Sequence, residues 1–142
     1  MADINGVIFF CDDVREERSG KMSYIGAYGP VIFVDQVPSL IPRMTAVFLG
    51  RIRGIERVSV KIRATLEGAP EAEMSLSEEK VFERPKEELG EDWILRINVV
   101  GPLPAAENAK YKVWCQVEDF TASSELLILP TTRAPANVEV QP

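Results

Sequence analysis

Residues 57–66, RVSVKIRATL, alternate apolar and polar side chains more regularly than any other stretch of the chain. Successive side chains of a β-strand point to opposite faces of a sheet, so this period of two predicts a strand with one buried face. The apolar members are expected to form that buried face: Val58, Val60, Ile62 and Ala64. The segment therefore indicates a half-buried strand in a β-rich protein.

Similar strand-like runs recur about every ten residues on both sides of this segment, separated by turn signals. They cover residues 7–11, 22–28, 31–34, 43–53, 72–83, 93–99, 111–117 and 125–129. No segment has a convincing helical period, and the gaps are too short for the helices of parallel β/α units. We therefore predict an all-β fold, a single antiparallel β-sandwich of about eight strands of the Ig-like or Greek-key type.

Prolines and glycines mark the expected ends of several strands. Pro38 and Pro42 bracket a crossover that is expected to lie outside the sheets, and residues 101–104, GPLP, are expected to end the strand before them. Residues 131–142 are rich in Pro, Ala and Thr and lack apolar periodicity, which predicts a flexible C-terminal tail. The expected organisation is a sandwich domain at 1–130 and a tail at 131–142.

The composition fits one soluble domain, with 142 residues, 46% of them apolar, and a net charge of −6. Residues 67–142 hold most of the negative charge, and an acidic chain repels phosphate backbones, so a nucleic-acid partner is not expected. No run approaches the ~18 apolar residues of a membrane span, and the N-terminus lacks the pattern of a secretory leader. We expect a cytoplasmic protein with no membrane span.

The chain has two cysteines and no histidine. Cys11 and Cys115 lie in strand-like runs, and reduced, buried thiols are expected in preference to a disulfide. The lack of histidine excludes Ser-His and Cys-His catalysis, and a zinc site would need an unusual ligand set. We expect no catalytic residue, no metal and no cofactor, with an enzyme of unknown mechanism as the minority alternative.

An acidic segment at residues 12–17 contains four carboxylates within six residues, enough oxygen ligands to consider a hard cation such as calcium. Its spacing matches no EF-hand loop, and neighbouring arginines would compete as counter-ions. We favour a solvated hairpin loop with mutual ion pairs, and cation binding stays open as the alternative. The residues of this network are Asp12, Asp13, Arg15, Glu16, Glu17 and Lys21.

Basic side chains recur on both sides of Gly54, at Arg51, Arg53, Arg57, Lys61 and Arg63. On adjacent antiparallel strands they would share one face and form a positive stripe able to dock an acidic partner or a phosphate. Pairing within the chain is the favoured alternative. The acidic residues considered for it are Glu71, Glu73, Glu78 and Glu79.

Trp114 lies between Val113 and Cys115, which are expected to point inward, so the period of two places the indole on the outer face. An outward Trp offers a large apolar area for a partner at low entropic cost. The equally weighted alternative is that the C-terminal tail or an edge loop covers the indole.

The opening CDDVREERSGKMSYIGAY, followed by Pro-x-x-x-Pro-Arg, resembles a bacterial family of small proteins known only as a domain of unknown function. The matching positions are Asp12, Asp13, Arg15, Gly20, Lys21, Ser23, Gly26, Tyr28, Pro38, Pro42 and Arg43. The resemblance implies a β-sandwich-like fold and carries no assigned activity. The chain departs from that pattern in the acidic stretch 71–92 and after Pro130.

Together these features favour a non-catalytic interaction or structural module, a subunit or accessory of a larger bacterial or phage assembly. A protein partner is expected, and a second copy of the chain is one candidate. The expected contact residues are Trp114, Arg51, Arg53, Lys61 and Arg63. A cation- or ligand-binding sandwich that uses residues 12–17 is the main rival.

Overall fold

The computed structural model describes residues 3–68, 74–83 and 92–133, and these ranges are all-β. They form ten strands and one 3-10 turn, where the sequence predicted about eight strands. The elements are β1 (Asp3–Cys11), β2 (Asp13–Glu16), β3 (Met22–Ile25), β4 (Val31–Val34), β5 (Ser39–Arg53), β6 (Arg57–Glu67), β7 (Met74–Glu83), β8 (Asp92–Ala105), β9 (Lys110–Val117), β10 (Phe120–Pro130) and η2 (Thr131–Arg133). No helix in these ranges has the length and apolarity needed to cross a membrane.

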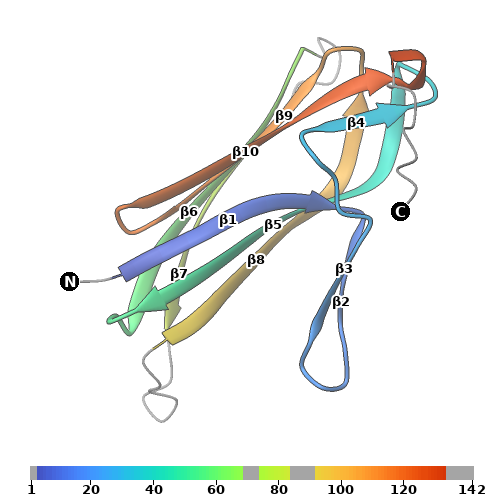
Figure 1. Cartoon of the computed structure of the whole chain (residues 1–142). Coiled ribbons are helices and arrows are strands. Elements are labelled where there is room, and N and C mark those ends of the chain that lie inside the picture. Colours follow the sequence, from blue (N-terminus) through green and yellow to red (C-terminus); the bar gives the residue numbers. More distant parts are fainter. Residues whose placement is uncertain (1–2, 69–73, 84–91, 134–142) are drawn as a thin grey trace, which may run out of the picture.

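The strands form two larger sheets and one separate hairpin (Figure 1). The three-stranded sheet has the order β1-β5-β8, and the five-stranded sheet has the order β4-β10-β9-β6-β7. The hairpin consists of β2 and β3 and diverges from the three-stranded sheet at the end of β1 (Figure 1).

One strand pair contradicts the prediction of a wholly antiparallel fold, because β4 and β10 run parallel, with Val31 opposite Leu127. The other strand pairs in the described ranges are antiparallel. A tight turn forces two strands to run antiparallel, whereas strands far apart in the sequence are free of that constraint. The sequence pattern of β4 carries no signal for its distant partner.

The predicted alternation of β6 and β9 is confirmed. Both strands lie inside the five-stranded sheet, paired through Ile62 and Cys115. The inward side chains are all buried, whereas Lys61 and Arg63 are exposed. The buried set is Val58, Val60, Ile62, Ala64, Tyr111, Val113, Cys115 and Val117.

The inner faces of the two larger sheets share one apolar cluster. The three-stranded sheet contributes Phe10, Phe48 and Ile52, and the five-stranded sheet contributes the inward side chains of β6, β9 and β10. The rings of Phe10 and Tyr111 join the two sets, with their centroids 5.6 Å apart. Each large apolar side chain buried in this way stabilises the fold by about 1.5–3 kcal/mol.

Two strands continue through prolines that the sequence predicted to interrupt them. β5 begins at Ser39 and absorbs Pro42 in a register shift between Ile41 and Met44, so that segment belongs to the sheet and is not a crossover. β8 continues to Ala105 through Pro102 and Pro104. It lies at the edge of its sheet, where a missing N–H donor need not break a ladder bond.

Both cysteines are free and buried, as predicted. Burial raises the pKa of Cys115 to about 12. Burial, followed by the charge of Asp12, also raises the pKa of Cys11. Both side chains are therefore neutral thiols at physiological pH.

The predicted domain boundary coincides with the end of β10 at Pro130. Thr131–Arg133 form the short turn η2, where the Thr131 hydroxyl donates to Asp35 at 2.9 Å. The rest of the predicted tail, residues 134–142, and the acidic residues Glu71 and Glu73 lie outside the described ranges.

Replacing Thr45 with valine should stabilise the protein by about 1 kcal/mol. Thr45 is 1% exposed, and its hydroxyl has no hydrogen-bond partner among the described residues. Valine has the same shape and removes a polar group whose burial is costly. Urea denaturation measures the effect, and Val47→Thr is the matched control.

Val47 lies two residues after Thr45 on the same face of β5 and is fully buried. Val47→Thr should destabilise the protein by a similar amount, because it adds a buried hydroxyl. A loss of stability in Thr45→Val would contradict this account of the Thr45 hydroxyl.

Candidate functional site

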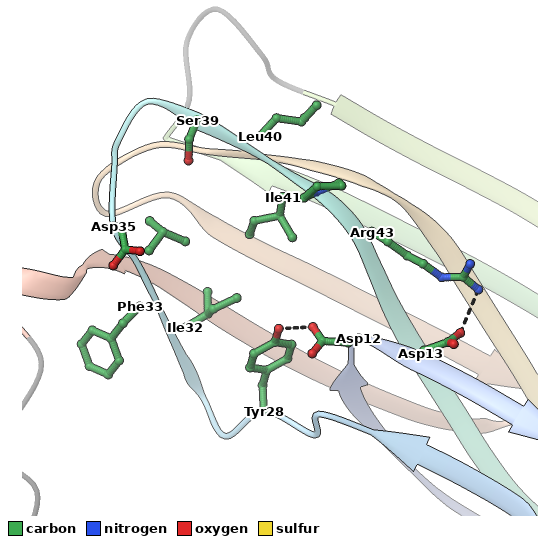
Figure 2. Close-up of a pocket in the computed structure, with 12 residues that line it drawn as sticks. Asp12, Asp13, Tyr28, Ile32, Phe33, Asp35, Ser39, Leu40, Ile41 and Arg43 are labelled. Atoms are coloured by element: carbon green, nitrogen blue, oxygen red, sulfur yellow. Dashed lines mark hydrogen bonds and ion pairs between the residues drawn. The ribbon is translucent and has the colours of Figure 1, made fainter.

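Five of the motif residues line a hollow of about 630 Å³ beside β4 and the start of β5, here called the acidic hollow (Figure 2). They are Asp12, Asp13, Tyr28, Pro42 and Arg43. The N-terminal end of β2, the segment after β3, and strands β4 and β5 all contribute side chains to it. The lining residues are Asp12, Asp13, Tyr28, Ile32, Phe33, Val34, Asp35, Ser39, Leu40, Ile41, Pro42 and Arg43.

Asp12 and Tyr28 face each other across this hollow, and the Tyr28 hydroxyl donates a hydrogen bond to Asp12 Oδ1 (Figure 2). Burial, followed by the bond to Asp12, raises the pKa of Tyr28 to about 12, so the phenol keeps its proton at neutral pH. The Tyr28 backbone N–H also donates to the carbonyl of Phe10 at 2.8 Å. Tyr28 is thereby joined to the end of β1 by both side chain and backbone.

Gly26 is needed beside this pair for a steric and a conformational reason. Its φ is +65°, a left-handed conformation that is unfavourable for residues with a Cβ. A Cβ at Gly26 would also overlap the carboxylate of Asp12. The glycine therefore lets the chain after β3 pass close enough for Tyr28 to reach Asp12.

Asp13 is held by two arginines. Arg15 Nε donates to Asp13 Oδ2 at 3.2 Å, and Arg43 Nη2 lies 3.0 Å from Asp13 Oδ1 (Figure 2). The bond from Arg15, the N–H of Val14 and the charge of Arg43 lower the pKa of Asp13 against the opposing effect of burial. Because Arg43 is on β5, the ion pair joins the hairpin to the three-stranded sheet.

The acidic segment does not assemble into a ligand cage. Asp12 accepts from Tyr28, Asp13 pairs with arginines, and Glu17 accepts from the Ser23 hydroxyl at 2.8 Å. Within the described residues no three Asp, Glu, Cys or His side chains lie close enough together to hold a metal ion. The geometry favours the predicted hairpin with internal polar contacts over the cation alternative.

The motif residues thus make contacts that hold the hairpin in place. Gly20 supplies the turn with φ +83°. No protein-family model matches the chain, and no curated protein matches its sequence. The resemblance to a family of unknown function therefore stays a prediction.

A second hollow of about 750 Å³ lies between the hairpin and the outer face of the three-stranded sheet, and we call it the hairpin groove. Tyr24 of the hairpin packs edge-on against Phe9 of β1, with ring centroids 4.9 Å apart. The groove is lined by Asn5, Gly6, Val7, Gly20, Lys21, Met22, Tyr24, Leu49, Gly50, Arg51, Ile94 and Arg96.

The floor of the hairpin groove is apolar and open. Val7 is 54% exposed and Ile94 is 56% exposed. Leu49 on β5 lies opposite Val7 of β1 and Arg96 of β8, and Ile94 lies opposite Arg51 in the adjacent row. Three cations, Lys21, Arg51 and Arg96, also line the groove, and none of its described lining residues is acidic. None of these three side chains forms an ion pair with a residue that the structure describes.

The predicted positive stripe is wrong as a single surface. Arg51 and Arg53 lie on β5 of the three-stranded sheet, whereas Lys61 and Arg63 lie on β6 of the five-stranded sheet. The chain changes sheets at Gly54, so the two strands do not pair. The sequence separation suited a hairpin equally well, which is why the pattern could not distinguish the two arrangements.

The individual cations of that set have different surroundings. Arg53 donates two hydrogen bonds to the carboxylate of Asp92, from Nε to Oδ1 at 2.7 Å and from Nη2 to Oδ2 at 3.2 Å. Arg57 Nε lies 3.6 Å from Glu83 Oε1. Lys61 is the cross-strand neighbour of Glu79 on β7. Arg51 alone among these cations lines the hairpin groove.

Trp114 lies on the outer face of β9, as predicted, and is half-buried. The guanidinium carbon of Arg63, its cross-strand neighbour on β6, lies 5.5 Å from the centroid of the Trp114 ring. Cation–π stacking of this kind stabilises an exposed pair by about 0.5–1 kcal/mol. The two predicted contact residues therefore contact each other.

The sequence analysis missed the apolar floor and Arg96. Ile94 and Arg96 alternate with the buried Leu95 and Ile97, which placed them on the outer face of β8. The alternation of apolar and polar residues was enough to place Ile94 and Arg96 on the outer face. Their position next to Arg51 and Lys21 depends on the strand order and on the position of the hairpin, which the alternation does not predict.

Gly26→Ala should destabilise the protein by about 2 kcal/mol or more, because the left-handed backbone and the overlap with Asp12 both oppose a Cβ. Gly20→Ala is the matched control, since Gly20 is also left-handed but has no atom within 4 Å of its Cβ position. It should cost about 1–2 kcal/mol. Equal losses of unfolding free energy for the two variants would contradict the role assigned to Asp12.

Asp13→Asn should flatten the dependence of stability on acidic pH. Because the native pKa of Asp13 is lowered, its carboxylate stabilises the fold above about pH 4 and this contribution is lost as the pH falls through the lowered value. Urea denaturation at a series of pH values from 6 to about 2 measures the slope. An unchanged slope would show that the two arginines do not act on Asp13 in solution.

Proposed function

We propose that the protein is a non-catalytic interaction module, a subunit or accessory of a larger bacterial or phage assembly, acting in the cytoplasm. Its binding surface is the hairpin groove, and the partner is an acidic protein segment that carries an apolar side chain. The observation that supports this proposal is a set of three cations beside apolar side chains, with no ion-pair partner and no acidic lining residue in the part of the chain that the structure describes.

The charge of the groove is opposite in sign to the net charge of the whole chain. With 22 acidic and 16 basic residues, the chain is acidic as a whole, and seven of its cations form ion pairs with described residues. The described lining of the groove has the opposite balance, with three cations and no acid. Complementary charge steers an acidic partner to the groove and selects against basic ones.

The apolar floor determines which kind of side chain the partner segment carries between its acidic residues. Val7, Leu49 and Ile94 offer contact area that a free phosphate could not use, whereas a peptide side chain could bury it. Exposed apolar surface with a polar rim is typical of protein interaction sites. The partner segment therefore combines at least one aliphatic or aromatic side chain with flanking carboxylates.

We also propose that the two larger sheets are the layers of a β-sandwich of Ig-like or Greek-key type. The apolar cluster that their inner faces share supports this architecture. Such folds present loops and outer sheet faces to partners while the core stays closed. The contacts of Asp12, Asp13 and Glu17 argue against the rival cation-binding role.

Selection from a displayed random-peptide library tests the proposed function. The wild-type protein should enrich peptides that combine Asp or Glu with apolar residues, and fluorescence anisotropy should then give their affinities. Arg51→Glu should weaken binding of an enriched peptide about tenfold or more, because it replaces an attraction with a repulsion in the groove. Lys61→Glu changes the net charge equally on the other sheet and should change the affinity less than twofold.

Equal losses in Arg51→Glu and Lys61→Glu would show that only overall charge matters and would overturn the proposed site. Enrichment of basic or purely polar peptides would overturn the assigned partner chemistry. A selection that enriches no sequence family would count against the interaction module itself.

A further inference from the structure

β8 leaves one side of the three-stranded sheet open. In the part of the chain that the structure describes, β8 pairs only with β5, so the backbone groups on its other side have no strand partner. Natural proteins protect such edges with short strands, lysines, prolines or bulges. The stretch 92–100, DWILRINVV, contains no lysine and no proline, and its pairing with β5 is regular.

The edge strands of the five-stranded sheet are protected by shortness or by charge. β4 is only four residues long, and β7 carries Glu78, Glu79, Lys80 and Glu83. The end of β1 is occupied at Phe10, which forms a bridge with Tyr28. β8 and the part of β1 before Phe10 are thus the long, weakly charged edges of the described structure, and prolines enter β8 only from Pro102 onward.

The outer face of β8 also exposes apolar side chains at two symmetric positions. Ile94 is 56% exposed and Val100 is 50% exposed. They lie three residues before and three residues after Ile97. Arg96 and Asn98 lie one residue before and one residue after the same point.

We propose that a second copy of the chain pairs with this edge, β8 against β8 in antiparallel orientation, with Ile97 opposite Ile97. In this register Ile94 lies opposite Val100 of the other copy, and Arg96 lies opposite Asn98. Apolar side chains meet apolar ones, and no charge faces a like charge, so the strand is complementary to itself. Cross-strand pairs of this kind stabilise a sheet, whereas opposed like charges destabilise it.

The two three-stranded sheets then form one six-stranded sheet with a two-fold axis at Ile97. This is an isologous contact, in which each copy uses the same surface and the assembly closes at two chains. The outer faces stay open, so both hairpin grooves lie on one continuous surface. The pairing uses β8 alone and does not depend on what the groove binds.

Charge-swap variants test both the contact and its register by light scattering after gel filtration. The wild type should have twice the 15.8 kDa mass of one chain. Ile94→Lys combined with Val100→Lys places lysines opposite each other at both ends and should halve the observed mass. Ile94→Lys combined with Val100→Glu places opposite charges together and should restore the doubled mass.

Val81→Lys on β7 is the matched control, because Val81 is 51% exposed on a different edge strand. It should keep the doubled mass. All these positions are at least half exposed, so each variant should fold, and a thermal melt followed by circular dichroism verifies it.

A wild-type protein with the mass of one chain at its highest attainable concentration would overturn the proposal. A doubled mass for the two-lysine variant, or a folded lysine–glutamate variant with single-chain mass, would overturn it as well. Loss of the doubled mass in Val81→Lys would assign the contact to β7 in place of β8. Arg51→Glu, a groove variant on β5 and not on the pairing strand, should leave the mass unchanged, which separates this test from that of the proposed function.

Discussion

Burial of the apolar side chains of β6 and β9 against those of β1 and β5 is the interaction on which the rest of the structure depends. Each strand commits alternate residues to this shared core, so the remaining residues must lie on outer faces. That constraint puts Arg51 and Arg96 on the outer surface of one sheet and Lys61 and Arg63 on that of the other. The two outer faces are consequently free to differ in charge and function.

The hairpin turns one of these outer faces into a groove. Its position is held by Asp12 with Tyr28, by Asp13 with Arg43, and by the packing of Tyr24 on Phe9. Asp12, Asp13, Tyr28 and Arg43 of the N-terminal motif are used in these contacts, so they act on the groove through the position of the hairpin. Its polar residues hold one wall of a hollow whose floor is formed by β1, β5 and β8.

Local patterns predicted the parts of this structure that depend on local chemistry. The period of two identified the inward faces of β6 and β9 and the outward position of Trp114. It failed where pairing is decided by residues far apart in sequence: the parallel contact of β4 with β10, and the change of sheet between Arg53 and Arg57. The candidate site depends on the same long-range order, so Arg51 was identified from sequence while its neighbours Ile94 and Arg96 were not.

The parallel contact of β4 with β10 has a consequence for how the chain acquires its structure during synthesis. β4 ends at Val34, and the residues that pair with it, Leu127–Pro130, emerge from the ribosome more than ninety residues later. Until then the edge of β4 has no strand to join, and the five-stranded sheet lacks a member between β4 and β9. Sheets closed by such distant segments form slowly, so the nascent chain must stay soluble with its longest-range pairing still missing.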